Sequence, residues 1–236
     1  MSGIGTADTF YGDGMLRGVS VTIDQEQIRH VNALLRFAPE RALVVYKRAI
    51  QRGLSAGRVQ ANKEIRERYD ISNANLNNTD GHSYSTYSEK VMEDGGGVAG
   101  YINFAGAKIP LYRFHPQPKT RTYTTRYVNG YGGWRVTTDV SAADVRGQMI
   151  RRRTAFIATM PSGHTGIWKR TGKYTHLDKE GKRTSGSKPE FRELWGFSVK
   201  DMLDYEPARE AVRERMAEIV SKRIDHELFR ELDAIK

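Results

Sequence analysis

Apolar and polar side chains alternate over residues 19–23, where Val, Val and Ile are separated by Ser and Thr. A period of two is typical of a strand with one buried face. Asp24 comes next, and Gln27 follows it by three residues, which is an acidic variant of the capping box. The pattern therefore predicts a short strand that leads directly into a helix.

A longer helical pattern begins near Pro39. Proline is tolerated in the first turn of a helix but breaks its interior, so Pro39 is expected to be the first residue. Apolar side chains then recur at helical spacing, and the predicted buried stripe includes Val59 and Ile65. Gly53 and Gly57 weaken the middle of this helix and indicate close packing or a bend.

The middle of the chain is rich in strand signals. Residues 84–92 and 97–105 flank an acidic, glycine-rich turn, and the segment 120–140 has β-rich arms around Asn-Gly-Tyr-Gly-Gly. Both patterns predict hairpins. Residues 108–114 and 151–159 are further strand candidates, while the polar segment 174–190 is predicted to be a loop.

The C-terminal pattern is again helical. Pro207 occupies the place of the first helical residue, and residues 207–233 carry an apolar stripe with charges of both signs on the other face. Helices, then strands, then a helix indicate an α+β fold, with long N-terminal and C-terminal helices packed on one face of an antiparallel sheet. We expect a flexible arm over residues 1–18 and a single domain over residues 19–236.

The net charge of +10 is concentrated in the middle of the chain. Residues 101–200 hold 19 Lys and Arg against 6 Asp and Glu, net +13, whereas residues 201–236 are net −3. Such a distribution suits nucleic acid or an acidic protein partner, although a solvated face with surplus cations has the same composition.

The chain has no cysteine, which excludes disulfides, thiol catalysis and cysteine-ligated zinc. No apolar window is long enough for a membrane span.

The segment 155–173, AFIATMPSGHTGIWKRTGK, is the strongest candidate for chemistry. Ser162 and His164 are close in sequence, but nothing marks a third group or an oxyanion hole, and G-x-S-x-G is missing. The six histidines are scattered, and no phosphate-binding or dinucleotide-binding glycine pattern occurs. We therefore expect no catalytic, metal or cofactor site, and interpret this segment as a strand, a turn with positive φ at Gly163, and a returning strand over 166–170 closed by Thr171 and Gly172.

Arg151, Arg152 and Arg153, with the tyrosines of residues 123–131, form a candidate DNA-facing or assembly surface. Phosphates need cations, and unpaired bases stack on aromatic rings. Alternate residues of a strand point to opposite faces, however, so the three arginines cannot all line one patch. A Tyr, Thr and Arg mixture is also typical of a solvated hairpin.

Two segments of the chain resemble the prophage minor tail protein Z family, the lambda-type tail completion or neck proteins of long-tailed bacteriophages. The first match consists of Phe156, Met160, Ser162, Gly163, His164, Gly166, Arg170 and Gly172. The second consists of Glu193, Leu194, Gly196, Ser198, Val199 and Met202. The overall resemblance spans roughly residues 20–236. Phe197 departs from the family pattern, which usually has proline at that position.

The resemblance implies a structural protein of the virion tail or neck, assembled in the bacterial cytoplasm, that completes the tail and helps form the head–tail junction through which DNA passes. It implies contacts with other neck and tail proteins, such as the tail terminator and the head completion protein, and self-association in a ring. It brings no catalytic residues, no cofactor and no membrane. Weak nonspecific contact with DNA fits the basic middle of the chain. The alternative is a phage-encoded, sequence-independent nucleic-acid-binding protein.

Overall fold

The computed structural model describes residues 18–77, 86–94, 97–118, 123–128, 131–136, 139–143, 145–182 and 184–234. The chain forms two compact units, each assembled from segments that are separate in sequence. Unit 1 consists of residues 1–65, 85–106 and 199–236, and unit 2 consists of residues 66–84 and 107–198. The predicted arm over residues 1–18 lies outside the described residues, except for Gly18, which begins the first strand.

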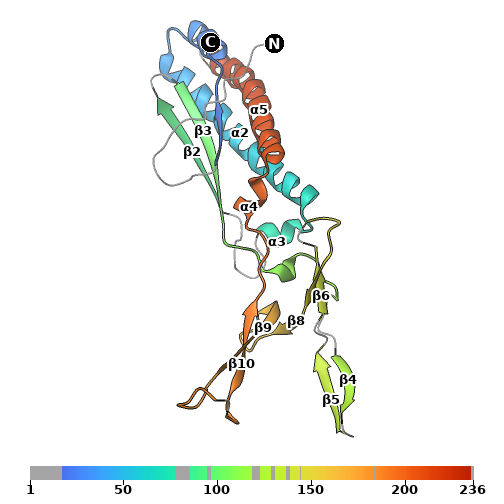
Figure 1. The fold of residues 1–236 in the computed structure, drawn as a ribbon. Helices are drawn as coiled ribbons and strands as arrows, with labels where there is room; N and C mark the ends of the chain where they lie inside the picture. The colour runs from blue at the N-terminus through green and yellow to red at the C-terminus, as the bar shows by residue number, and fades with distance from the viewer. Residues whose placement is uncertain are drawn as a thin grey trace. The chain divides into compact units, whose positions relative to one another are not determined.

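Unit 1 contains a three-stranded antiparallel sheet (Figure 1). Its strands are β1 (Gly18–Thr22), β2 (Thr86–Asp94) and β3 (Gly97–Ala105), in the order β1-β3-β2. The alternating pattern of β1 is confirmed, because Val19 and Val21 are buried and the intervening Ser20 is exposed. The hairpin predicted from the glycine-rich turn is also confirmed, since β2 and β3 pair along their whole lengths.

Four helices complete unit 1 among the described residues. They are α1 (Gln25–Leu34), α2 (Pro39–Arg68, whose last turn belongs to unit 2), α4 (Val199–Leu203) and α5 (Glu206–Asp233). Asp24 caps α1 as predicted, accepting a hydrogen bond from the backbone N–H of Glu26. Gln27 does not complete a capping box, because its side-chain amide donates instead to the hydroxyl of Ser221 on α5, at 2.9 Å.

The long helices pack closely on the sheet and on each other. A Cβ atom at Gly100 of β3 would lie 2.4 Å from the Ile50 side chain of α2. A Cβ at Gly53 would lie 2.4 Å from Val220 Cγ2, and one at Gly57 would lie 2.5 Å from Met216 Cγ, both on α5. The two glycines therefore permit close helix packing, which was one of the two predicted roles. The mixed α+β fold, with a long C-terminal helix, is confirmed.

The predicted apolar stripe of α2 is wrong at Val59, which is 67% exposed. The buried face instead contains Ala42, Val45, Tyr46, Ala49, Ile50, Gly53, Leu54, Gly57, Ala61 and Ile65. At 3.6 residues per turn, Val59 lies about half a turn around the helix from Gly57. Because glycine contributes no hydrophobicity to a sequence pattern, a face that packs through two glycines is easily misplaced.

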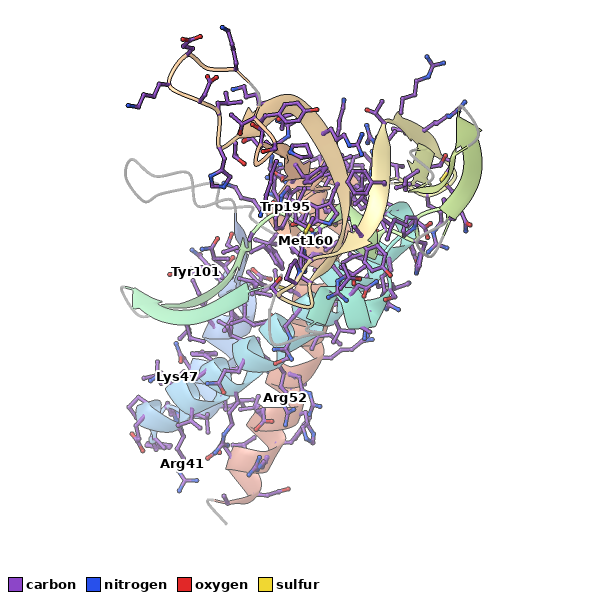
Figure 2. All side chains as sticks on the ribbon, turned by 90° about the horizontal axis from the view of Figure 1, so that it is seen from below. Arg41, Lys47, Arg52, Tyr101, Met160 and Trp195 are labelled. Carbon is purple, nitrogen blue, oxygen red and sulfur yellow. The ribbon has the colours of Figure 1, made fainter. Side chains whose placement is uncertain are left out.

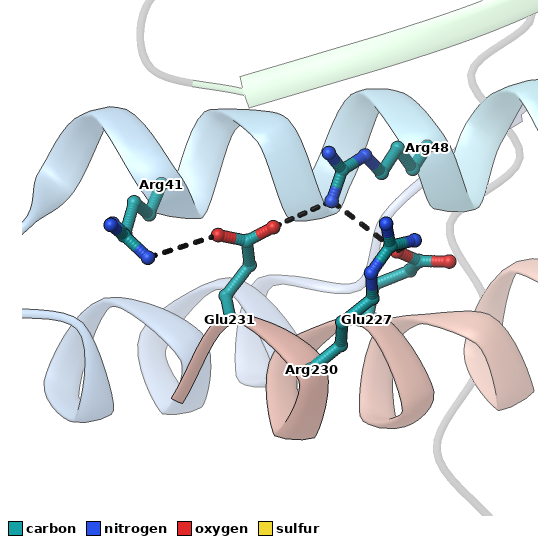
Figure 3. A network of polar contacts seen from close by, with 5 residues as sticks. All are labelled: Arg41, Arg48, Glu227, Arg230 and Glu231. Carbon is teal, nitrogen blue, oxygen red and sulfur yellow. Dashed lines mark hydrogen bonds and ion pairs between the residues drawn. The ribbon is translucent and has the colours of Figure 1, made fainter. Parts of the chain in front are cut away.

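Ion pairs reinforce the contact between α2 and α5 (Figure 3). Arg48 Nη1 lies 2.5 Å from Glu231 Oε1 and 3.6 Å from Glu227 Oε2. Arg41 reaches the other oxygen of Glu231 at 3.4 Å. The side chain of Glu227 is only 7% exposed, whereas that of Arg48 is 38% exposed, so the cation keeps water while the carboxylate does not.

Unit 2 is built from short sheets. The strands are β4 (Tyr123–Val128), β5 (Tyr131–Val136), β6 (Asp139–Ala142), β7 (Ile150–Arg153), β8 (Ala155–Thr159), β9 (Thr165–Thr175) and β10 (Lys188–Glu193). They pair antiparallel as β10-β9-β8, β4-β5 and β6-β7. Helix α3 (Asn73–Asn77) and the 3₁₀ helix η1 (Leu111–Arg113) also belong to this unit. The predicted hairpin over 120–140 is confirmed by β4 and β5, with residues 129 and 130 outside the described residues.

Three predictions in this unit are wrong. Residues 108–114 are not a strand, because the chain turns into η1 and, among the described residues, forms a single bridge, between Pro110 and Trp195. The strand predicted over 151–159 is broken at Thr154, whose φ of 62° ends β7 and begins β8. Strand β9 is not closed by Gly172 but continues to Thr175, so the loop predicted over 174–190 is bordered by paired residues at both ends.

The two units interleave along the chain, so neither is a contiguous segment. Helix α2 passes from one unit into the other without interruption. The prediction of a single domain over residues 19–236 concerns whether the two units fold cooperatively, and it stays a prediction.

Candidate functional site

The two segments that carry the family resemblance meet at Glu193, the last residue of β10 and the first of the second match. Trp168 of β9 is paired with Glu193 of β10, and Phe156 of β8 is paired with Trp168 from the other side. Beyond the end of β10, the backbone N–H of Leu194 donates to the carbonyl of Ile167 at 2.8 Å. The strand residues of segment 156–172 and Glu193 of segment 193–202 therefore lie in the β8–β9–β10 sheet, whereas Val199 and Met202 lie in α4.

The turn between β8 and β9 is built from the motif residues at its centre. The N–H of Met160 donates to the carbonyl of His164, and the N–H of Gly163 donates to the carbonyl of Met160, both at 2.9 Å. Gly163 has φ of 85°, as predicted for the turn. Ser162 is exposed here, and Figure 2 marks the position of Met160.

His164, Gly166, Trp168 and Glu193 form a contact cluster at the start of β9. His164 Nε2 lies 2.7 Å from Glu193 Oε1, and the His164 ring meets the Trp168 ring edge-on with centroids 6.1 Å apart. The Trp168 indole N–H donates to the carbonyl of Ala158 at 3.0 Å. A Cβ at Gly166 would lie 2.5 Å from Glu193 Oε1, so glycine makes room for this carboxylate.

A histidine bonded to a carboxylate near a serine invites comparison with a catalytic triad. A triad needs the serine hydroxyl within hydrogen-bonding reach of the free imidazole nitrogen. Among the described residues, Ser162 makes no hydrogen bond with His164. The recorded hydrogen bond of the His164 ring joins Nε2 to Glu193 Oε1, and it holds the β8–β9 turn against β10. The prediction that the protein is not an enzyme remains a prediction.

The remaining residues of the first match have separate places on the sheet. Phe156 packs edge-on against Phe191 of β10, with ring centroids 5.4 Å apart. Arg170 is exposed and paired with Phe191 across the strands. Gly172 has φ of 84° and lies where the β9–β10 register shifts, so it forms a bulge rather than the end of the strand.

Leu194 and Gly196 connect the sheet to η1. The carbonyl of Leu194 accepts from the N–H of Leu111 at 2.9 Å, and the N–H of Gly196 donates to the carbonyl of Ile109 at 2.8 Å. A Cβ at Gly196 would lie 2.6 Å from the ring of Phe114, which is fully buried. Phe197, where the family usually has proline, packs against Tyr69 with ring centroids 5.5 Å apart.

Arg151, Arg152 and Arg153 lie in β7, outside the β8–β9–β10 sheet, and pair with Ser141, Val140 and Asp139 of β6. Arg151 and Arg153 are exposed, whereas Arg152 is half-buried. The alternation expected of a strand therefore divides the cluster between two faces.

We did not predict a role in the site for Trp168, Phe191 or Phe114, although these aromatic side chains hold the matched residues in place. Trp168 and Phe191 lie within strands whose alternation could have assigned them to one face with Phe156. Phe114 gave no such signal, because its role depends on the approach of Gly196 from a distant segment. Among the residues that the structure describes, no group of three or more His, Asp or Glu side chains is placed to hold a metal ion.

Gly163→Val is expected to lower the free energy of unfolding by about 1–2 kcal/mol, because a β-branched residue is strained at positive φ. No atom lies within 4 Å of a Cβ at this position, so backbone strain alone should cause the loss. Gly163→Asn is the matched control and should be nearly neutral, since asparagine tolerates this conformation. Thermal or urea unfolding measures both, and equal stability of the Val and Asn variants would contradict the explanation.

No protein-family model, no curated protein and no solved structure matches the chain. None of the helices in the described part of the chain is long and apolar enough to cross a membrane.

Proposed function

We propose that the chain is a structural protein of a long-tailed bacteriophage that completes the tail and helps form the head–tail junction. The proposal starts from the resemblance to the prophage minor tail protein Z family. The observation that carries it is the spatial pairing of the two matched segments in the β8–β9–β10 sheet, through Trp168, Glu193 and the His164–Glu193 bond. The His164–Glu193 bond joins the two matches, because each match contributes one of its residues.

The contacts of the matched residues support a structural role for the pattern. Gly163 supplies the turn, Gly166 makes room for the Glu193 carboxylate, and Gly196 admits the Phe114 ring. All three glycines therefore serve the folding of unit 2. The pattern can therefore identify a fold family without implying a reaction.

Under this proposal the protein works through contacts with its neighbours. A ring of identical subunits needs a heterologous interface, in which one patch meets a different patch on the next copy. The tail terminator and the head completion protein are the proposed partners of such a ring. Arg151 and Arg153, exposed on the same strand, are the proposed assembly contacts among the three arginines.

The direct test is a nonsense mutation in the phage or prophage that encodes the chain. We expect filled heads and tails to accumulate unjoined, and joining to be restored by the protein supplied in trans. Mass spectrometry of purified wild-type particles should detect the chain at a fixed ratio to the other tail proteins. Normal particles without the protein would refute the proposal.

Arg151→Glu with Arg153→Glu should yield a folded protein that fails in this complementation assay, because the reversal changes two exposed charges on one face. The matched control is Arg29→Glu with Arg52→Glu, two exposed cations of unit 1 with the same charge change. Infectious titre and particle morphology are the measurements. Equal titres from the β7 variant and the control would show that Arg151 and Arg153 are not assembly contacts. The proposed function itself would still be tested by the nonsense mutant.

A further inference from the structure

The excess positive charge of the chain belongs to unit 2. This unit contains 20 Lys and Arg against 9 Asp and Glu, net +11, whereas unit 1 contains 18 against 19, net −1. A charge imbalance of this size attracts polyanions and raises the question of which element of unit 2 presents it.

Strands β9 and β10 extend past the end of their pairing with β8 as a two-stranded ribbon, here defined as residues 169–175 and 188–192, in which Lys169 is the last residue that also pairs with β8. Strand β8 pairs with β9 only over Thr165–Lys169, so the rest of β9 has β10 as its one paired neighbour in the described structure. Most of the ribbon's residues are exposed. The faces of the ribbon are therefore accessible to a partner.

Three exposed cations share one face of the ribbon. Lys169 is paired directly with Arg192 across the strands, and Lys188 lies on the same face of β10 because its position differs from Arg192 by an even number of residues. Like charges placed directly opposite each other destabilise a sheet. The acid on this face is Glu190, and its carboxylate accepts a hydrogen bond from the Thr171 hydroxyl at 2.8 Å.

Within the described part of the chain, Lys169, Lys188 and Arg192 have no side-chain hydrogen bond or ion pair. The charges of α5 differ in this respect. Five carboxylates of α5 form ion pairs with Arg or Lys side chains of α5 itself or of α2. They belong to Glu206, Glu210, Glu218, Glu227 and Glu231. Hydrogen bonds from Arg209 and Arg213 hold the pKa of Glu206 below its usual value, and those from Lys222 and Arg215 do the same for Glu218. Most carboxylates of α5 are therefore already bound to cations, and the exposed Glu214 and Asp225 are the two that a second copy could offer to the ribbon from the described part of this helix.

We propose that the cationic face of the β9–β10 ribbon binds the phosphate backbone of duplex DNA, independently of sequence. The major groove of B-DNA, about 12 Å wide, admits a two-stranded ribbon. Phosphates would supply the counter-charges that Lys169, Lys188 and Arg192 lack among the residues that the structure describes. This inference does not depend on the proposed place in the virion, because the isolated chain should show it.

The test uses purified full-length protein and a short fluorescent duplex, with anisotropy measured between about 50 and 200 mM salt. The ribbon variant is Lys169→Gln, Lys188→Gln and Arg192→Gln, and the matched control is Arg29→Gln, Arg36→Gln and Arg52→Gln, three exposed cations of unit 1. Each neutralised phosphate contact contributes about 0.9 to the slope of log K against log salt, so the ribbon variant should lose about 2–3 units of slope. The control should keep the slope of the wild-type protein.

Folding is checked by thermal unfolding, where the ribbon variant should melt no lower than the wild type because a cross-strand repulsion has been removed. Lys169→Arg with Lys188→Arg keeps the charges and should keep the slope, which gives a second readout if the triple variant does not fold. An unchanged slope in a folded ribbon variant would overturn the proposal. Equally tight, equally salt-dependent binding of polyglutamate would also overturn it, in favour of an acidic protein partner.

Discussion

Gly53→Val is expected to lower the free energy of unfolding by about 2–3 kcal/mol, because it forces atoms into a close contact between α2 and α5. The added Cβ alone would lie 2.4 Å from Val220 Cγ2 and 3.2 Å from the backbone carbonyl oxygen of Met216. Val220 is β-branched and stiff, and the carbonyl belongs to a helix, so neither can move away cheaply. Calorimetry or urea unfolding of the purified variant measures the loss.

Two companion variants distinguish a packing effect from a helix effect. The double variant Gly53→Ala with Val220→Ala should be more stable than Gly53→Ala alone, because the smaller side chain at position 220 makes room for the added Cβ at position 53. Val59→Ala, at a side chain that is 67% exposed on the same helix, should change the stability by less than about 0.5 kcal/mol. A Gly53→Val protein as stable as the wild type would contradict the close approach of the two helices.

Arg48→Ala is expected to cost about 2–3 kcal/mol, because it leaves the buried Glu227 carboxylate without its cation on α2 (Figure 3). Glu227 would keep only the Arg230 guanidinium, at 3.5 Å, among the ion pairs of the described residues. Glu227→Gln should cost less, since Arg48 is partly exposed and still reaches Glu231 at 2.5 Å. Chemical unfolding of both variants measures this asymmetry.

The double variant, Arg48→Ala with Glu227→Gln, tests the cause. If an unpaired buried charge is responsible, removing that charge should restore stability relative to Arg48→Ala alone. Arg52→Ala, at an exposed position one turn further along α2, is the control for lost helix charge and should be nearly neutral. A double variant less stable than either single variant would show that the pair acts through packing instead.

The sequence by itself determined the elements whose signals are local. Asp24 caps α1, Pro39 begins α2, and α5 begins with Glu206 and Pro207 at its N-terminus. Cap and proline effects act within a few residues of the chain, so no tertiary information is needed to predict them. The hairpins β2–β3 and β4–β5 were equally predictable, because turn residues and β-rich arms lie next to each other in sequence.

Only the tertiary structure decided which strands end and which continue. Nothing in the sequence around Thr154 distinguishes a broken strand from a continuous one, yet its φ of 62° divides β7 from β8. Gly172 was predicted to close a strand, but β10 supplies partners beyond it, and the strand runs through as a bulge. Residues 108–114 have strand propensity, but hydrogen bonds with Leu194 and Gly196 hold them around η1 instead. In each place a distant segment overrides a local preference.

The candidate site divides in the same way. The turn at Gly163 was predictable, because positive φ favours glycine in a local turn. The His164–Glu193 bond, the Gly196–Phe114 contact and the opposition of Lys169 and Arg192 were not, since each joins residues from segments that come together only on folding. The sequence by itself determined how much positive charge the middle of the chain carries, whereas pairing within the tertiary structure decided which of those charges remain available to a partner.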